Sequence, residues 1–422
     1  MKTRTIGLIS LFIFAVALTI CVSPTASSAQ HKMRMQQEPA KVIFPEGKDV
    51  VEIPFTFERN KILIPVRVNG SEPMTFILDS GAPIAVVRDP DFGSKVDLNI
   101  VGQAHVGGAG EDETQSVPIA GDVTLQLGDI EITGSSMAVG VGNRLPDTGW
   151  DGVIGGPLFT NLVIDFDFTN KILRFYSPDN YTYSGNGSVL PLTISHGSFA
   201  HVNTEISIDG GPATPAKFVI DTGAGNALSV NTDDALGAPE KTIDGIIGWG
   251  ANGVIRGRTG RVASLKLGDY VLNDLVASFP DASGMHAIRA AGVSKDETGI
   301  LGAKVLKRFH VIFDYPNSRM ILEPNGAFET PFTFNNTGLM ALPWAPGASS
   351  IEVVYVLESS PAQTVGVEIG DHITAINGRP VAEFGVDALE DVFKQAPGSK
   401  ITLTIHRETE EFEMKLVLEE LI

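Results

Sequence analysis

The sequence predicts a mainly β chain in which one β lobe occurs twice, followed by a smaller α+β domain. Four sequence elements recur in the same order in residues 46–185 and 186–327. The 45 glycines, 25 prolines and short helical-period runs favour strands joined by tight turns. Residues 328–422 have a different pattern, in which helix-start signals alternate with strands. These observations divide the chain into two related lobes and a third unit.

The repeat is visible when the two copies are compared element by element. Each begins with a hairpin that ends in an acid–hydroxyl–glycine loop, "FILDSGA" in the first copy and "FVIDTGA" in the second. An "LxLGD" hairpin follows, in "VTLQLGDIEI" and "VASLKLGDYVL", and then a Gly-apolar-apolar-Gly segment, "GVIGG" or "GILGA", that leads into a strand pair. Recurrence in one order predicts two copies of one supersecondary unit.

The acid–hydroxyl–glycine loops place Asp79 and Asp221 at the ends of two apolar strands. A carboxylate at a buried strand end is costly unless it is paired or hydrogen-bonded. Two lobes related by a pseudo-twofold axis would bring these acids together, and close like charges cannot both ionise, so the pair would share a proton. The ionised partner could then deprotonate a water while the protonated partner polarises a carbonyl, without a metal, cofactor or covalent intermediate.

The residues after each aspartate suit this chemistry. Gly81 and Gly223 have no Cβ, so the loop can turn sharply and bring its N–H groups to the carboxylate. Ser80 and Thr222 supply hydroxyls that can bond across to the opposite loop and fix the geometry of the pair. We expect these four residues to support the two acids.

The paired "DSGA" and "DTGA" loops, each followed by "GVIGG" or "GILGA", resemble the signatures of the aspartic peptidase superfamily. The resemblance is nearest to retropepsin-like bacterial aspartyl proteases with both lobes in one chain, and it covers roughly residues 46–327. It implies duplicated acid-protease β lobes with Asp79 and Asp221 as the catalytic pair. Two fused lobes remove the need for a dimer, so a monomer is expected.

The resemblance also implies a glycine-rich hairpin in each lobe that closes over substrate as a flap. The candidates lie in "VGGAGEDE" and "GWGANG", at Gly107, Gly108, Gly110, Gly248, Trp249 and Gly250. Trp249 either closes on a bound peptide or packs beneath the flap. "GWGANG" also matches a dinucleotide fingerprint, but a strand pattern follows it instead of a helix, so that interpretation is rejected.

The loops depart from the larger pepsin-like enzymes at Ala82 and Ala224, where those enzymes usually carry a hydroxyl that stabilises the ionised pair. One hydrogen bond fewer to the charged form makes the pair harder to ionise. The hypothesis that follows is a pH optimum milder than that of a stomach-type enzyme.

The last unit, residues 328–422, resembles a PDZ domain of the bacterial protease-associated type, most specifically over residues 351–407. "SPAQTVGVEIGDHITAINGRPV" and the helix pattern after it carry the resemblance. A PDZ groove adds an extended peptide beside its longer helix and captures the terminal carboxylate, so a C-terminal peptide is the expected partner. The candidate carboxylate loop is Gly338, Leu339 and Met340, although the "PWAPGASS" insert is unusual. The alternative is a PDZ fold used as a spacer.

The N-terminal residues predict export. Lys2 and Arg4 precede an apolar stretch, and "SPTASSA" offers small residues for cleavage after Ala29. We therefore expect a signal peptide over residues 1–29 and a linker over residues 30–45, with an uncleaved anchor as the alternative. Such a signal implies a bacterial periplasmic, envelope or extracellular location. The single cysteine, Cys21, would be lost on cleavage, so no disulfide is expected.

Composition and the remaining motifs narrow the function. An excess of acidic over basic residues, 50 to 31, argues against nucleic acid as a partner. Zinc-peptidase and serine-hydrolase motifs are missing from the sequence, so no metal site is expected. Asp165 and Asp167 alternate with apolar residues and are predicted to face solvent. The sequence thus predicts an exported aspartic endopeptidase acting on peptide or protein substrates; the alternative is a non-catalytic peptide-binding protein on the same scaffold.

Overall fold

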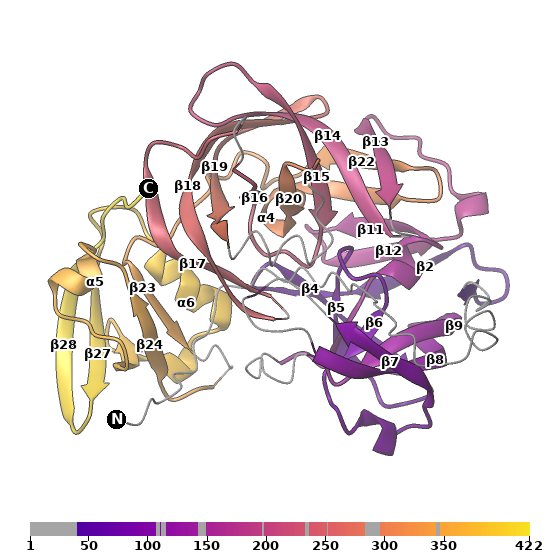
Figure 1. Ribbon diagram of the computed structural model, residues 1–422, viewed down its shortest axis with the longest axis horizontal. Helices are drawn as coiled ribbons and strands as arrows, with labels where there is room; N and C mark the ends of the chain where they lie inside the picture. The colour runs from indigo at the N-terminus through magenta and orange to yellow at the C-terminus, as the bar shows by residue number, and fades with distance from the viewer. Residues whose placement is uncertain are drawn as a thin grey trace.

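The computed structural model describes residues 40–106, 110, 115–141, 149–195, 198–232, 236–250, 252–282, 296–342 and 347–422. Figure 1 shows the first lobe in indigo and purple, the second in pink and orange, and the C-terminal domain in yellow at one side. The predicted signal peptide lies outside the described residues. Within them, no helix has both the length and the apolar character needed to span a membrane.

The first lobe is almost entirely β-sheet. Its elements are β1 (Lys41–Ile43), β2 (Val50–Pro54), β3 (Thr56–Glu58), β4 (Lys61–Val68), β5 (Met74–Leu78), β6 (Ala85–Val87), β7 (Asn99–Val106), β8 (Gln115–Leu127), β9 (Ile130–Val139), β10 (Gly152–Ile154), α2 (Gly156–Phe159), β11 (Val163–Asp167) and β12 (Ile172–Tyr176). In the described part of the lobe, strands pair in the order β1-β9-β6-β10-β5-β4-β8-β7, with β3 beside β4. The "LxLGD" motif forms the β8–β9 turn, as predicted.

The second lobe repeats this arrangement. Its elements are β13 (Ser188–Ser195), β14 (Phe199–Ser207), β15 (Thr214–Asp221), β16 (Leu228–Val230), β17 (Thr242–Gly250), β18 (Gly253–Leu267), β19 (Tyr270–Pro280), β20 (Gly299–Gly302), α4 (Ala303–Leu306), β21 (Phe309–Asp314) and β22 (Arg319–Pro324). In the first lobe β5 pairs in parallel with β10, and in the second β15 pairs in parallel with β20. Each acid-bearing strand is therefore held by the Gly-apolar-apolar-Gly strand of its own lobe.

A shared sheet joins the two lobes. β11 pairs with β21 in antiparallel register, from Val163 opposite Asp314 to Phe166 opposite Val311. This pairing continues the sheet in the order β13-β22-β21-β11-β12-β2, so strands from both halves lie side by side. Phe166 and Phe313 meet edge to face beneath it, with ring centroids 5.2 Å apart, in one core that spans both lobes. The lobes are therefore fused through backbone pairing and a common core.

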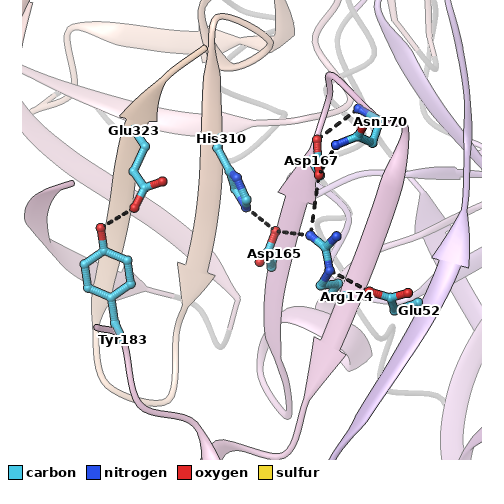
Figure 2. A network of polar contacts seen from close by, with 8 residues as sticks. All are labelled: Glu52, Asp165, Asp167, Asn170, Arg174, Tyr183, His310 and Glu323. Atoms are coloured by element: carbon cyan, nitrogen blue, oxygen red, sulfur yellow. Dashed lines mark hydrogen bonds and ion pairs between the residues drawn. The ribbon is translucent and has the colours of Figure 1, made fainter. Parts of the chain in front are cut away.

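Two acids of this sheet correct a prediction from the sequence. Asp165 and Asp167 are buried, not solvent-facing. Figure 2 shows their partners: Asp165 lies 2.5 Å from His310, and the Arg174 guanidinium lies 3.7 Å from Asp165 and 3.6 Å from Asp167. Alternation of apolar and charged residues indicated an exposed face, but the two strands beside β11 supply partners there: Arg174 from β12 of the same lobe and His310 from β21 of the other lobe. A buried acid needs such partners.

The C-terminal domain has the strand and helix order expected of a PDZ domain. Its elements are β23 (Leu339–Leu342), β24 (Ile351–Val356), α5 (Pro361–Thr364), β25 (His372–Ile376), β26 (Arg379–Pro380), α6 (Val386–Phe393), β27 (Lys400–Arg407) and β28 (Glu410–Val417). The predicted helix start is present, since the Ser360 side chain accepts a hydrogen bond from the Gln363 amide. The domain contacts the second lobe, where the Tyr355 hydroxyl donates to the Asp244 carbonyl of β17 at 3.0 Å.

Candidate active site

The two predicted acids lie at equivalent strand ends in the two lobes. Asp79 directly follows β5, and Asp221 is the last residue of β15. Their residues are 0% and 1% exposed. The three residues before each acid, 76–78 and 218–220, are apolar and buried.

The loops wrap each carboxylate in backbone N–H groups. The Gly81 amide donates to Asp79 Oδ1 at 2.7 Å. In the second lobe the Gly223 and Ala224 amides donate to Asp221 Oδ1 at 2.8 Å and 3.0 Å. Hydrogen bonds to the charged form of a carboxyl favour ionisation, so the loops partly offset the cost of burial.

The structure brings the two acids together. A Cβ added to Gly223 would lie 2.3 Å from Asp79 Cγ, and one added to Gly81 would lie 3.1 Å from Asp221 Cγ. Each carboxyl therefore lies against the glycine of the opposite loop, where a larger residue would displace it. Glycine at these two positions allows the close approach.

Burial raises the pKa of both carboxyls, and the neighbouring Asp221 raises that of Asp79 further. Burial, followed by the Asp221 charge, raises the pKa of Asp79 well above its ordinary value. Burial also raises the pKa of Asp221 to about 6, against the opposing effect of a nearby lysine, Lys61. Asp79 Oδ2 is buried and has no N–H or O–H hydrogen-bond donor in the part of the chain described. A proton shared with Asp221 would satisfy this oxygen.

Ser80 and Thr222 connect the loops across the lobe interface. The Ser80 amide donates to Thr222 Oγ1 at 2.9 Å, and the Thr222 amide donates to Ser80 Oγ at 3.0 Å. Each hydroxyl then donates at 2.8 Å to the opposite strand, Ser80 Oγ to the Ile220 carbonyl and Thr222 Oγ1 to the Leu78 carbonyl. The four groups form a closed, reciprocal set that fixes one loop against the other.

The Gly-apolar-apolar-Gly segments support the loops from behind. A Cβ on Gly155 would lie 1.8 Å from the Asp79 carbonyl oxygen, and a Cβ on Gly302 would lie 2.4 Å from the Asn226 carbonyl oxygen. Neither distance is compatible with a side chain. The motif therefore recurs because each loop backbone packs directly on a glycine.

The two candidate flaps approach each other. A Cβ on Gly110 would lie 2.1 Å from the carbonyl of Asn252, which stands in the turn between β17 and β18. Gly107 and Gly108 lie outside the described residues, whereas Gly248 and Gly250 lie in β17. Gly110 of the first lobe therefore lies against the β17–β18 turn of the second.

Trp249 is 3% exposed and belongs to an apolar cluster with residues of the first lobe. The cluster includes Ile77 of β5, Val86 of β6 and Val153 of β10. Ile77 stands two residues before Asp79. The β17–β18 hairpin therefore covers the strands that carry the first acid, and Trp249 packs beneath it in this structure.

The predicted carboxylate loop of the C-terminal domain borders a pocket. Gly338 has φ of +76°, and a Cβ there would lie 2.2 Å from Ser360 Cβ, so only glycine fits. The Leu339 amide already donates to Thr337 Oγ1 at 3.1 Å. Gly338, Leu339 and Met340 line a pocket of about 100 Å³ whose other wall includes Ile243 and Ile246 of β17. The second lobe thus closes one side of this pocket.

Lys61 is the residue of the site that the sequence analysis missed. It begins β4, is 5% exposed, and donates from Nζ to the Gly223 carbonyl. A lysine at the start of a strand after a turn is usually solvated, so its local pattern gave no signal. Its partner lies 162 residues away in the other lobe, so the contact becomes visible only in the fold.

No group of three or more His, Cys, Asp or Glu residues that could hold a metal ion occurs within the described ranges. The chemistry available from the described site is that of two buried carboxyls, their amide donors and one ammonium group. Such a set can exchange protons with a water and a carbonyl compound placed between the acids.

Comparisons with known proteins agree with this architecture. Residues 204–305 match the aspartyl protease family model, and residues 352–407 match the PDZ domain model. Human syntenin-1 is 44% identical over 57 residues, 14% of this chain and 19% of syntenin-1. A putative zinc metalloprotease of Agrobacterium fabrum is 29% identical over 168 residues, 38% of this chain and 40% of that protein. The chain thus spans less than half the length of either curated relative.

Among solved structures, the aspartic proteinase from Irpex lacteus has a TM-score of 0.41 and 16% identity, covering 67% of this chain and 99% of that one. The aspartyl protease match contains the second acid loop and its "GILGA" segment. The PDZ match lies within the predicted third unit. The chain therefore combines a retropepsin-like aspartyl protease domain with a C-terminal PDZ domain.

Proposed function

We propose that this protein is an exported aspartic endopeptidase. In the proposed reaction the Asp79–Asp221 pair, carrying one shared proton, holds a solvent water between its carboxyls. The ionised carboxyl removes a proton from the water as its oxygen attacks the scissile carbonyl carbon, and the protonated carboxyl donates to the carbonyl oxygen. The tetrahedral species then collapses, with a proton passing to the leaving amine as the C–N bond breaks.

One observation carries this proposal: two buried carboxyls meet at the junction of the two lobes with their loops connected by reciprocal hydrogen bonds. Burying a carboxyl lowers the stability of a protein unless the group is paired. Buried acids with shifted pKa values therefore concentrate at active sites, where function compensates for this cost. The raised pKa values favour a shared proton at weakly acidic pH. Fixed loops also keep the acids in place while the water reacts, which is how preorganised groups lower a barrier.

The hairpins supply a means of holding the substrate. An extended peptide lying over Asp79 and Asp221 would run under the β17–β18 hairpin, whose Trp249 belongs to the same apolar cluster as Ile77, Val86 and Val153. Opening of this hairpin would free that apolar surface for substrate side chains. We therefore expect Trp249 to move between packing and contact with bound peptide.

For the PDZ domain we propose binding of peptide or protein C-termini in the pocket beside β23 and α6. Its apolar lining, including Leu339, Tyr355 and Leu357, suits an apolar terminal side chain. The Leu339 amide already donates to Thr337 Oγ1, so a terminal carboxylate would accept its hydrogen bonds from other donors. Anisotropy titrations with a labelled peptide, once with a free and once with an amidated C-terminus, test this role. Equal affinity for the two peptides would contradict it.

We further propose that the N-terminal segment directs export and that the folded chain acts as a monomer. Two acid loops from one chain complete the proposed site, which supports the monomer. Mass spectrometry of the protein recovered from an expressing bacterium tests for cleavage after Ala29. Sedimentation velocity tests the oligomeric state.

The proposed activity is tested by incubating the purified protein with a mixed peptide library across a pH series. We expect endoproteolytic products from the wild type and none from Asp79→Asn or Asp221→Asn. Asparagine keeps the size of the side chain but cannot take part in the shared proton. Unchanged cleavage by both variants, or no cleavage by the wild type at any pH, would favour the alternative of a peptide-binding protein on this scaffold.

A further inference from the structure

Lys61 lies beside the acid pair but on the opposite lobe from Asp221. It starts β4 of the first lobe, while the carbonyl that accepts its Nζ hydrogen bond belongs to Gly223, in the loop after Asp221. The Gly223 amide in turn donates to Asp221 Oδ1 at 2.8 Å. The ammonium is therefore one peptide unit away from the groups that hold this carboxylate.

The repeat does not place a second cation in the corresponding position. Leu63 pairs with Ile77 in the first lobe, and His201 pairs with Val219 in the second, each opposite the residue two before the acid. Counting back two residues makes Phe199 the counterpart of Lys61. The lysine thus makes two otherwise similar loops electrostatically unequal.

A buried ammonium needs compensation, and the acids supply it. Burial lowers the pKa of Lys61 to about 8, and the charges of Asp221 and then Asp79 act in the opposite direction. Arg59, on the turn before β4, repels the ammonium. Tyr315, which follows β21, is also buried; burial raises the pKa of its hydroxyl, and the charges of Asp221 and Asp79 add to this. With one shared proton, the acid pair carries a single negative charge that balances one lysine charge.

We propose that Lys61 is a positioning residue that holds the negative charge of the acid pair on the Asp221 side at weakly acidic pH, leaving the shared proton toward Asp79. This inference rests on the proposed peptidase function. Asp221 would then be the group that accepts the proton from water, and Asp79 the group that donates to the carbonyl. Its ammonium donates to the Gly223 carbonyl, and in this proposal it acts on the acids through their shared charge.

The consequence is a defined shift in the pH dependence of activity. A cation beside the pair stabilises its singly ionised form over its doubly protonated form, so removal of the cation should raise the pH at which that form appears. A nearby opposite charge typically shifts a carboxyl by about one to three pH units. The acid limb of kcat/KM reports this ionisation in the free enzyme.

The deciding experiment compares the pH profile of kcat/KM for the wild type, Lys61→Gln, Lys61→Met and Lys61→Arg on one peptide substrate. Glutamine keeps a donor for the Gly223 carbonyl without the charge, methionine removes both, and arginine keeps the charge. We expect the acid limb of the glutamine and methionine variants to move up by about one to three pH units. At a fixed pH on the acid limb, each pH unit of this shift should lower kcat/KM roughly tenfold. The arginine variant should keep the acid limb near that of the wild type.

A purely structural role would lower the thermal unfolding temperature of the variants but leave the acid limb in place. An active wild type whose profile coincides with that of Lys61→Gln would overturn the inference alone, as would an arginine variant that moves as far as glutamine. If the wild type, like the Asp79→Asn variant, cleaves no peptide, the peptidase function is overturned and this inference with it. If the methionine variant does not fold, the glutamine variant decides.

Discussion

Ser80 and Thr222 each donate a backbone N–H to the other's hydroxyl, at 2.9 Å and 3.0 Å respectively, across the junction of the two lobes. Both side chains are buried, and each hydroxyl donates a hydrogen bond to a strand carbonyl of the opposite lobe. The geometry of the acid pair is therefore coupled to the docking of one lobe on the other.

Replacing Thr222 with valine should both destabilise the protein and slow catalysis. Valine keeps the shape but leaves the buried Ser80 amide and Leu78 carbonyl without their partner, at a cost of roughly 1–3 kcal/mol each. Urea unfolding and kcat measure the two effects. Thr222→Ser, which keeps the hydroxyl, is the matched control and should stay near the wild type. A valine variant with an unchanged free energy of unfolding would show that these hydrogen bonds make no net contribution to stability.

Gly155→Ala should reduce activity because it displaces the loop of Asp79. Its Cβ would lie 1.8 Å from the Asp79 carbonyl oxygen, so the loop or β10 has to move. Overpacking of this kind costs about 1–3 kcal/mol, and a shift of the acid should lower kcat further. Gly237→Ala is the control, since no atom lies within 4 Å of its added Cβ. Equal activity and stability of the two variants would contradict the role of this glycine.

The acid loops and their supporting segments could be predicted from the sequence because they are local. An apolar strand, an acid, a hydroxyl and a glycine occupy consecutive positions, so Asp79 and Asp221 are recognisable without knowledge of distant contacts. Duplication then predicted that they meet. The predicted mainly β fold with a terminal PDZ domain is confirmed for the same reason, since its strands, turns and the Ser360 cap are short-range features.

Features that depend on contacts between the lobes could not be predicted in this way. Lys61 was not identified from the sequence, and the prediction of solvent-facing Asp165 and Asp167 was wrong. Their partners, Gly223 and His310, lie 162 and 145 residues away in sequence from Lys61 and Asp165. A charge pattern within one strand carries no information about which strand covers it. The pairing of β11 with β21 decides that, and it became visible only in the fold.

The ion network on the shared sheet predicts a pH-dependent part of the stability. The hydrogen bond that the His310 imidazole donates to Asp165 outweighs burial and raises the pKa of His310 above its ordinary value. Asp167 and Glu323 add favourable charge. Because the folded-state pKa is raised, this stabilisation is fully present below the unfolded value of 6.5 and is lost as the pH rises through the folded value.

His310→Gln should therefore be less stable than the wild type by about 1 kcal/mol at pH 5.5, with the difference shrinking toward pH 8.5. The estimate is kept small because the His310 side chain is 31% exposed. Urea unfolding of both proteins at several pH values measures the difference. A gap that stays constant or widens with pH would mean that protonated His310 does not stabilise the sheet.

Trp249 links the covering hairpin to the strands of the first acid, so its truncation should act on substrate binding more than on the chemical step. Trp249→Ala removes a large aromatic side chain from the apolar cluster that includes Ile77, Val86 and Val153, and the hairpin should spend more time open. We expect KM to rise about tenfold, equivalent to about 1.4 kcal/mol, with kcat changed less. Trp249→Phe keeps most of the apolar surface and should lie between alanine and wild type. A loss confined to kcat would place Trp249 in positioning of the acids rather than in retention of the peptide.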